Sequence, residues 1–179
     1  MHQNTFRSQL KNKKMKKIYV IRHAKSSWKT NQTDFDRPLN PRGLRDAPRM
    51  AALLKSKDVK PDLLITSSAA RAKATAGFFA QALEIPKEQQ WETKELYHAS
   101  MLEILNVVAS IPDEYNTVIL FGHNPGFTYF ANEFWGENWI DNLPTCGIVE
   151  IEGDVDSWNL FTGATAKVVN HYFPKMYRD

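Results

Sequence analysis

The sequence has one cysteine and no long hydrophobic run. Cys146 is the only cysteine among 179 residues, so an internal disulfide is excluded and a reducing compartment is expected. We expect Cys146 to be a buried, small apolar residue. No stretch approaches the roughly 18 consecutive apolar residues of a membrane span. No apolar run near the N-terminus marks a signal peptide. These absences predict a cytoplasmic protein without membrane contact.

Acidic residues are absent from the first 17 residues, which carry six basic ones. The rest of the chain has 17 basic and 20 acidic residues, a net charge of −3, although the whole chain carries +3. We interpret residues 1–15 as a basic arm that is too polar to fold. We favour a solvated tail over a nucleic-acid-binding arm. Met15 precedes the first expected strand, which leaves open whether residues 1–14 belong to the native protein.

Residues 16–179 have the length of a single domain, with enough apolar residues for a core. Strand and helix signals alternate up to about Gly136 and then give way to strands. Strands are expected at 17–22, 62–66, 89–95, 117–121, 146–152 and parts of 157–172. Helices are expected from Asn40-Pro41 onward and at 69–84, 100–110 and 127–135. The pattern predicts an α/β fold with late strands added to a parallel core.

Local details of these elements can be predicted as well. Leu44 should share the buried face of the first helix with Ala47, Ala51 and Leu54, and Pro48 should kink that helix or delay its start. A Gly153-Asp154 turn should join the last two strands. Three aromatic residues that precede the last strands are expected in the core rather than in the wall of the pocket: Phe134, Trp135 and Trp139.

Three strands end at an arginine or a histidine. Arg22-His23 ends the strand 17–22, Arg71 follows the strand 62–66, and His123 follows the strand 117–121. If these strands are parallel neighbours, all four side chains meet at one edge of the sheet, where ligands bind in such folds. Two arginines and two histidines without an acid suit a dianion, and phosphate is the obvious candidate.

The same four residues can transfer a phosphoryl group. A neutral His23 is a competent nucleophile near pH 7, and water would hydrolyse the resulting phosphohistidine. Arg22, Arg71 and His123 would hold the phosphoryl oxygens in the transition state. The arginines supply positive charge, so we expect neither a metal nor a cofactor. Each segment alone would be interpreted as an ordinary loop. The phosphate site is predicted because all three segments follow a strand in the same way.

These segments resemble the histidine phosphatase superfamily, the phosphoglycerate-mutase-like group. Residues 22–28 (RHAKSSW), 36–43 (DRPLNPRG), 67–72 (SSAARA) and 122–126 (GHNPG) are similar to its motifs, most of all to those of SixA-type phosphohistidine phosphatases. The resemblance covers about residues 16–174. It implies a three-layer α/β/α sandwich with a mostly parallel sheet and late antiparallel strands. It also implies catalytic roles for His23, Arg22, Arg71 and His123, and a substrate-binding role for Ser26 and Asn124.

Two departures from the family pattern stand out. Ala24 replaces a common glycine, which should narrow the turn only slightly. No clear general acid is present: Glu95 and His98 are the candidates, and we favour an ordinary surface role for both. Asp34 and Asp36 are weaker candidates, better suited to turns and caps.

The missing acid bears on the substrate. An alcohol, about as weak an acid as water with its pKa of about 15.7, needs a proton to leave. The conjugate acid of imidazole has a pKa of about 6.5, so imidazole leaves with far less help. We therefore predict a phosphatase for protein phosphohistidine. A small-molecule phosphomonoesterase or mutase and a non-catalytic phosphate-binding regulatory module remain as alternatives. Phosphorylated proteins or small phosphoesters are the expected partners. The sequence does not indicate an oligomeric state.

Overall fold

The computed structural model describes residues 15–29 and 31–178, so residues 1–14 of the expected basic arm lie outside the described residues. Six strands form one sheet in the order β3-β2-β4-β1-β5-β6. Their bounds are β1 Lys16–Arg22, β2 Leu63–Ser67, β3 Gln90–Thr93, β4 Thr117–Gly122, β5 Ile148–Gly153 and β6 Ala166–Tyr172. The first four strands are parallel, and β5 and β6 are antiparallel to their neighbours.

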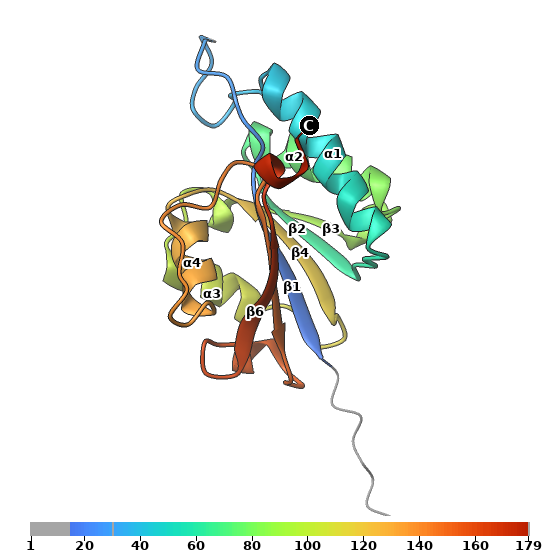
Figure 1. Ribbon diagram of the computed structural model, residues 1–179, viewed down its shortest axis with the longest axis vertical. Helices are drawn as coiled ribbons and strands as arrows, with labels where there is room; N and C mark the ends of the chain where they lie inside the picture. The colour runs from blue at the N-terminus through green and yellow to red at the C-terminus, as the bar shows by residue number, and fades with distance from the viewer. Residues whose placement is uncertain (1–14, 30, 179) are drawn as a thin grey trace, which may run out of the picture.

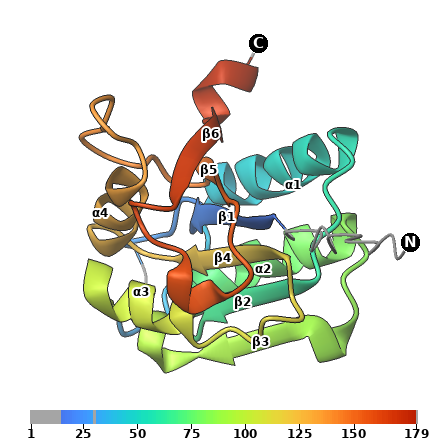
Figure 2. The ribbon, with the colours of Figure 1, turned by 90° about the horizontal axis from the view of Figure 1, so that it is seen from below.

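Helices cover both faces of the sheet. α1 (Pro41–Ser56) and α2 (Ala70–Ala82) lie on one face, and α3 (Met101–Ala109) and α4 (Gly126–Glu133) lie on the other (Figures 1 and 2). This confirms the three-layer α/β/α sandwich with a mostly parallel sheet and late antiparallel strands. None of the helices in the described part of the chain is long and apolar enough to cross a membrane.

The core consists of two apolar clusters, one on each face of the sheet. Ile18 and Val20 of β1 belong to the cluster beneath α3 and α4, and Tyr19 and Ile21 to the cluster beneath α1 and α2. A strand buried on both faces has no polar face, which explains why β1 is a continuous apolar run. Burial of each such side chain contributes about 1.5–3 kcal/mol.

The first helix starts where the sequence predicts. Asn40 Oδ1 accepts a hydrogen bond from Gly43 N at 2.9 Å and caps the helix. Pro48 lies inside α1 and does not delay its start. The prediction for Leu44 was wrong, because this side chain is 51% exposed and Met50 is buried instead. Gly43 packs directly on the Lys25 backbone, and this contact fixes which face of α1 turns inward.

The C-terminal region differs most from the prediction. No tight turn at Gly153-Asp154 joins β5 to β6; residues 154–165 connect them and contain a short 3₁₀ helix, Trp158–Leu160. Trp158 is fully buried in the core cluster beneath α3 and α4 and donates its indole N–H to Tyr115 O at 2.8 Å, which fixes this segment.

The aromatic residues before β5 also divide between the core and the surface. Phe134 is buried as expected, and Trp135 packs partly against the core. Trp139 is 64% exposed, so its assignment to the core was wrong. Cys146 is buried, and its burial raises the pKa of its thiol.

The contact between Gly43 and the loop after β1 yields a prediction. A Cβ at Gly43 would lie 2.1 Å from Lys25 O, so G43A should destabilise the protein by about 1–3 kcal/mol and shift the loop. Gly77 is the matched control: it also lies in a helix, but a Cβ there meets nothing within 4 Å. G77A should stabilise by about 0.5–1 kcal/mol. Chemical denaturation measures both, and equal effects would contradict the packing argument.

Candidate active site

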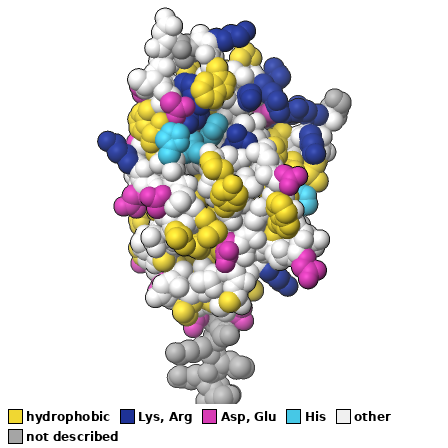
Figure 3. All heavy atoms as spheres, turned by 90° about the vertical axis from the view of Figure 1, so that its left-hand side faces the viewer, with side chains coloured by type: hydrophobic (Ala, Val, Ile, Leu, Met, Phe, Trp, Pro, Cys, Tyr) yellow, Lys and Arg dark blue, Asp and Glu magenta, His cyan; other side chains and the backbone are white. Residues whose placement is uncertain are grey.

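The parallel pairing of β1 with β4 places the two predicted histidines side by side. Arg22 pairs with Gly122, so His23 and His123 leave the sheet at the same level. His23 N donates to Gly122 O at 3.0 Å, and the centroids of the two imidazole rings are 5.1 Å apart. Figure 3 shows histidine side chains gathered in the upper half of one face, with acidic and basic side chains around them.

His23 is held with one ring nitrogen ready to react. Its Nδ1 lies 2.8 Å from Ala24 O. A carbonyl only accepts, so Nδ1 carries the proton and Nε2 keeps its lone pair. Burial lowers the pKa of His23 well below 6.5, and the charges of His123, Arg71 and Arg22 add to this effect; the hydrogen bond to Ala24 opposes it. His23 is therefore a neutral imidazole at neutral pH.

Arg71 lies directly against His23. Its Nε donates to His23 Nε2 at 3.3 Å, from the first turn of α2. The Thr75 hydroxyl ties the two segments together: it donates to Arg71 O at 2.7 Å and accepts from Ala24 N at 2.9 Å. The Thr75 hydroxyl thus fixes the position of Arg71 relative to the loop after β1.

The rest of the Arg71 guanidinium is bound by Asp34. Arg71 Nη1 donates to Asp34 O at 2.6 Å, and Nη2 lies 3.2 Å from Oδ2. The same carboxylate accepts from Tyr97 at 2.7 Å and from Arg37 Nε at 3.0 Å. The hydrogen bond from Tyr97, followed by the contacts with Arg37 and Arg71, holds the pKa of Asp34 well below its usual range. Asp34 is thus ionised and cannot donate a proton near pH 7.

His123 and Arg22, which both line the cavity, each have one buried polar atom without a partner in the described part of the chain. His123 Nε2 lies 2.8 Å from Ser67 Oγ, and Arg22 Nη1 donates to Leu143 O at 2.9 Å. His123 Nδ1 and Arg22 Nε have no hydrogen-bond partner among the described residues. Buried polar atoms of this kind are rare in folded proteins, and a bound oxyanion would satisfy both. Burial, followed by the charge of Arg71, lowers the pKa of His123 to about 3.

Most of the predicted residues line one cavity of about 220 Å³. It brings together Arg22, His23, Lys25, Ser26, Trp28, Asp34, Arg37, Arg71, His98, His123, Asn124 and Thr145. Glu95 lines a different hollow beside β3 and α3. Of the two leading candidates for a general acid, Glu95 and His98, only His98 therefore lines the cavity, where its Nε2 lies 3.3 Å from Asp34 Oδ2.

Ser26 and Asn124 differ in what they offer a ligand. Ser26 Oγ accepts from Arg37 Nη1 at 2.7 Å and keeps its own hydrogen to donate. Asn124 is engaged with its own surroundings: its amide N–H groups go to Asn142 and Leu143, and its carbonyl accepts from Thr128. Asn124 thus fixes the loop before β5.

Sequence reasoning missed the second layer of the site. Ser67 lies in the motif 67–72, but no role was predicted for its hydroxyl or for those of Tyr97 and Thr75, because a hydroxyl reveals its partner only in the folded chain. Asp34 was expected in a turn. It instead binds Arg71, which lies 37 residues further along the sequence. Asp36 does serve a turn, where its carboxylate accepts from Thr33 at 2.7 Å. In the described part of the chain, no group of three or more His, Cys, Asp or Glu is placed to hold a metal ion.

Two arginines and two histidines thus meet at the ends of parallel strands in an α/β sandwich. A family model described as the histidine phosphatase superfamily (branch 1) matches residues 18–125. The chain belongs to this superfamily.

Solved structures share the fold over most of the chain. The putative phosphohistidine phosphatase SixA from Agrobacterium tumefaciens is 26% identical, with a TM-score of 0.76 over 89% of this chain and 98% of that one. The putative SixA from Nakamurella multipartitia is 24% identical, with a TM-score of 0.76 over 89% and 96%.

Curated relatives match more locally. A 2,3-bisphosphoglycerate-dependent phosphoglycerate mutase of Bifidobacterium longum is 36% identical over 91 residues, which is 48% of this chain and 37% of the mutase. A chloroplastic protein of Arabidopsis thaliana described as uncharacterized is 29% identical over 80% of this chain and 69% of its own length.

The two buried histidines predict that the protein loses stability in mild acid. The pKa of His123 falls from 6.5 to about 3 on folding, and that of His23 also falls. Below pH 6.5 the unfolded chain therefore binds protons that the folded chain does not, so unfolding becomes easier as the pH drops. Each histidine should contribute a slope of about 1.4 kcal/mol per pH unit. Urea unfolding between pH 7 and pH 5 measures the slope.

The slope can be assigned to the site with one variant. His123→Asn should remove the share that His123 contributes, whatever its effect on stability at pH 7. The exposed His171 is the control, and H171N should keep the full slope. A free energy of unfolding that stays constant from pH 7 to pH 5 would contradict the buried, neutral state of both imidazoles.

Proposed function

We propose that this protein is a phosphatase that works through a phosphohistidine on His23, and that its substrate is a phosphohistidine carried by another protein. The observation that supports this most directly is the hydrogen bond from His23 Nδ1 to Ala24 O. It leaves Nε2 as the only ring nitrogen with a lone pair, on the side where Arg71 lies. A free lone pair and an adjacent guanidinium are the two groups that nucleophilic attack on a phosphoryl group calls for.

The reaction would take two steps. The Nε2 lone pair attacks phosphorus, and the bond from phosphorus to the leaving atom breaks, with its electron pair going to the leaving group. Water then attacks the phosphorylated His23, the P–Nε2 bond breaks, and inorganic phosphate leaves while excess protons go to solvent. Arg22, Arg71 and His123 would hold the three remaining oxygens in both steps. Arg22 Nε and His123 Nδ1 have the unused hydrogen-bonding capacity for this role.

The leaving-group argument supports a P–N bond in the substrate. Asp34 is ionised, and Glu95 lies outside the cavity, so His98 is the one candidate acid near His23. His98 is 61% exposed in its side chain and is bound to Asp34, so water has ready access to it. A site without a buried acid suits imidazole, whose conjugate acid has a pKa of about 6.5, better than an alcohol. The similarity in fold to proteins named SixA phosphohistidine phosphatase agrees with this choice.

A small-molecule phosphomonoesterase or mutase is the second candidate. The match to phosphoglycerate mutases at 36% identity favours it, although this chain spans only 37% of their length. A mutase has to keep its phosphoenzyme from water. A non-catalytic phosphate-binding module, the third alternative, would form no phosphoenzyme at all.

Replacement of His23 tests the nucleophile. The wild-type protein should retain labelled phosphate in an acid-labile, base-stable form when quenched during turnover, and H23A should retain none. The control is H171A, which removes an exposed histidine and should leave labelling unchanged. Labelling of H23A at the wild-type level, or undiminished phosphatase activity in it, would refute the assignment.

Leaving-group dependence tests the substrate class. The protein should hydrolyse a phosphohistidine protein faster than unactivated alkyl phosphates. H98A should change phosphohistidine turnover by less than about threefold, because general acid catalysis, worth about 10²–10⁴-fold where it is needed, is not required there. E95Q, in the separate hollow, is the control. Faster hydrolysis of alkyl phosphates would favour the phosphomonoesterase.

A further inference from the structure

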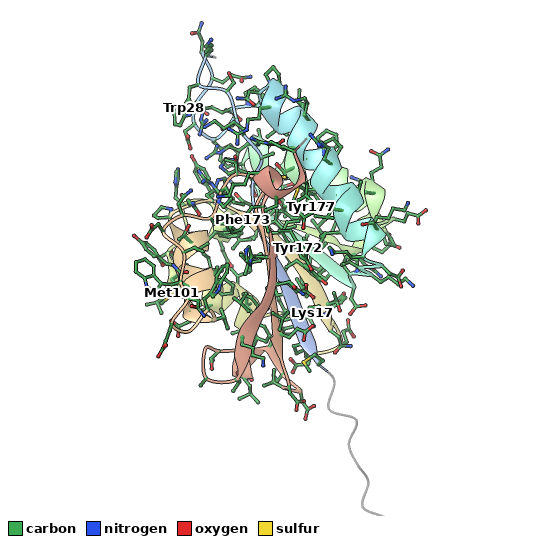
Figure 4. All side chains as sticks on the ribbon, viewed as in Figure 1. Lys17, Trp28, Met101, Tyr172, Phe173 and Tyr177 are labelled. Carbon is green, nitrogen blue, oxygen red and sulfur yellow. The ribbon has the colours of Figure 1, made fainter. Side chains whose placement is uncertain are left out.

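Trp28 stands at the rim of the cavity with most of its surface open. It lines the same cavity as His23, and the residue is 74% exposed. Figure 4 places Trp28 on the loop beyond one end of the sheet, while Lys17, near the start of β1, lies toward the other end. A large aromatic side chain this exposed gains little from folding. Its stability contribution therefore does not explain why it projects beside the nucleophile.

Arg37 holds the Trp28 ring from one side. The guanidinium carbon lies 3.6 Å from the centroid of the indole, a cation–π stack. Arg37 itself is only 6% exposed, and three groups fix its guanidinium. Nε lies 3.0 Å from Asp34 Oδ1, and Nη1 lies 2.7 Å from Ser26 Oγ and 3.3 Å from Ser27 O. Arg37 is thus held in place, and the Trp28 ring lies against it at the cavity wall.

From this geometry we propose that Trp28, backed by Arg37, is a platform on which the leaving group of the substrate stacks. The platform selects substrates whose phosphoryl group departs from a flat aromatic ring. A flat ring can lie on an indole face, whereas ammonia or an aliphatic amine offers no face to stack. The inference rests on the proposed function and adds to it a residue that recognises the leaving group rather than the phosphate.

The platform acts in the first step only. The P–N bond breaks, and the leaving imidazole takes the electron pair; if its other nitrogen is protonated, it departs neutral without a further proton. A ring stacked on Trp28 is held before, during and after this cleavage, so the platform contributes to binding rather than to charge stabilisation. The second step, attack of water on phosphorylated His23, involves no leaving ring. Loss of Trp28 should therefore change kcat/KM and leave the rate of phosphoenzyme hydrolysis unaltered.

Three substrates separate stacking from the chemistry of the broken bond. Phosphoimidazole has a P–N bond and a flat ring, p-nitrophenyl phosphate has a P–O bond and a flat ring, and phosphoramidate has a P–N bond and no ring. In W28A, kcat/KM should fall about three- to tenfold for the first two and stay within about twofold for phosphoramidate. A tenfold loss corresponds to about 1.36 kcal/mol, within the range of an aromatic pair. W28F should recover most of the loss.

Trp139 provides the control. It is also exposed, at 64%, but does not line the cavity. W139A should change none of the three values. An equal loss in W28A on all three substrates, or no loss on any, would overturn the platform while leaving the phosphatase assignment intact. A wild-type protein that forms no phosphoenzyme from any of the three or from a phosphohistidine protein would instead overturn the proposed function, and the platform with it.

Discussion

The alignment of β1, β4 and β2 is the constraint on which the site depends. Arg22 pairs with Gly122, and Thr66 pairs with Phe121, so three strands end at one level. His23, His123 and Ser67 meet there only in this register. A slip of one residue would turn every side chain of a strand to the opposite face and mix the two core clusters. The same apolar alternation that stabilises the sandwich therefore also sets the geometry of the cavity.

Electrostatics is the second constraint, because the site gathers positive charge among buried side chains. Burial lowers the pKa of Arg22 and Arg71, so each carries a desolvation cost. Asp34 offsets part of this cost, and the two histidines stay neutral. These side chains are thus held in place before a ligand arrives, and preorganised groups of this kind favour stabilisation of a transition state. The hydrogen bonds of Thr75 and Ser67 hold that arrangement with neutral groups.

The sequence predicted those features that a short local pattern of residues determines. Apolar runs identified β1, β2 and β4, caps identified α1 and α3, and polar residues at strand ends identified His23 and Arg71. It was uninformative where a side chain chooses among partners far apart in the chain. Nothing local distinguishes Asp34, which grips Arg71, from Asp36, which serves a turn. Trp158 and Trp139 likewise look alike in sequence, yet one is fully buried and the other is 64% exposed, because the path of the chain on either side of β5 decides it.

The contact between Asp34 and Arg71 has a consequence for the proposed reaction. In that reaction Asp34 competes with the phosphoryl group for the Arg71 guanidinium, which it contacts in this structure. A tethered group acts at an effective concentration of about millimolar or more, so free phosphate has to displace a rival that never diffuses away. A substrate has further contacts with the protein and can displace Asp34 from Arg71, whereas inorganic phosphate binds through its oxygens alone. The carboxylate should therefore hasten product departure and blunt inhibition by accumulated phosphate.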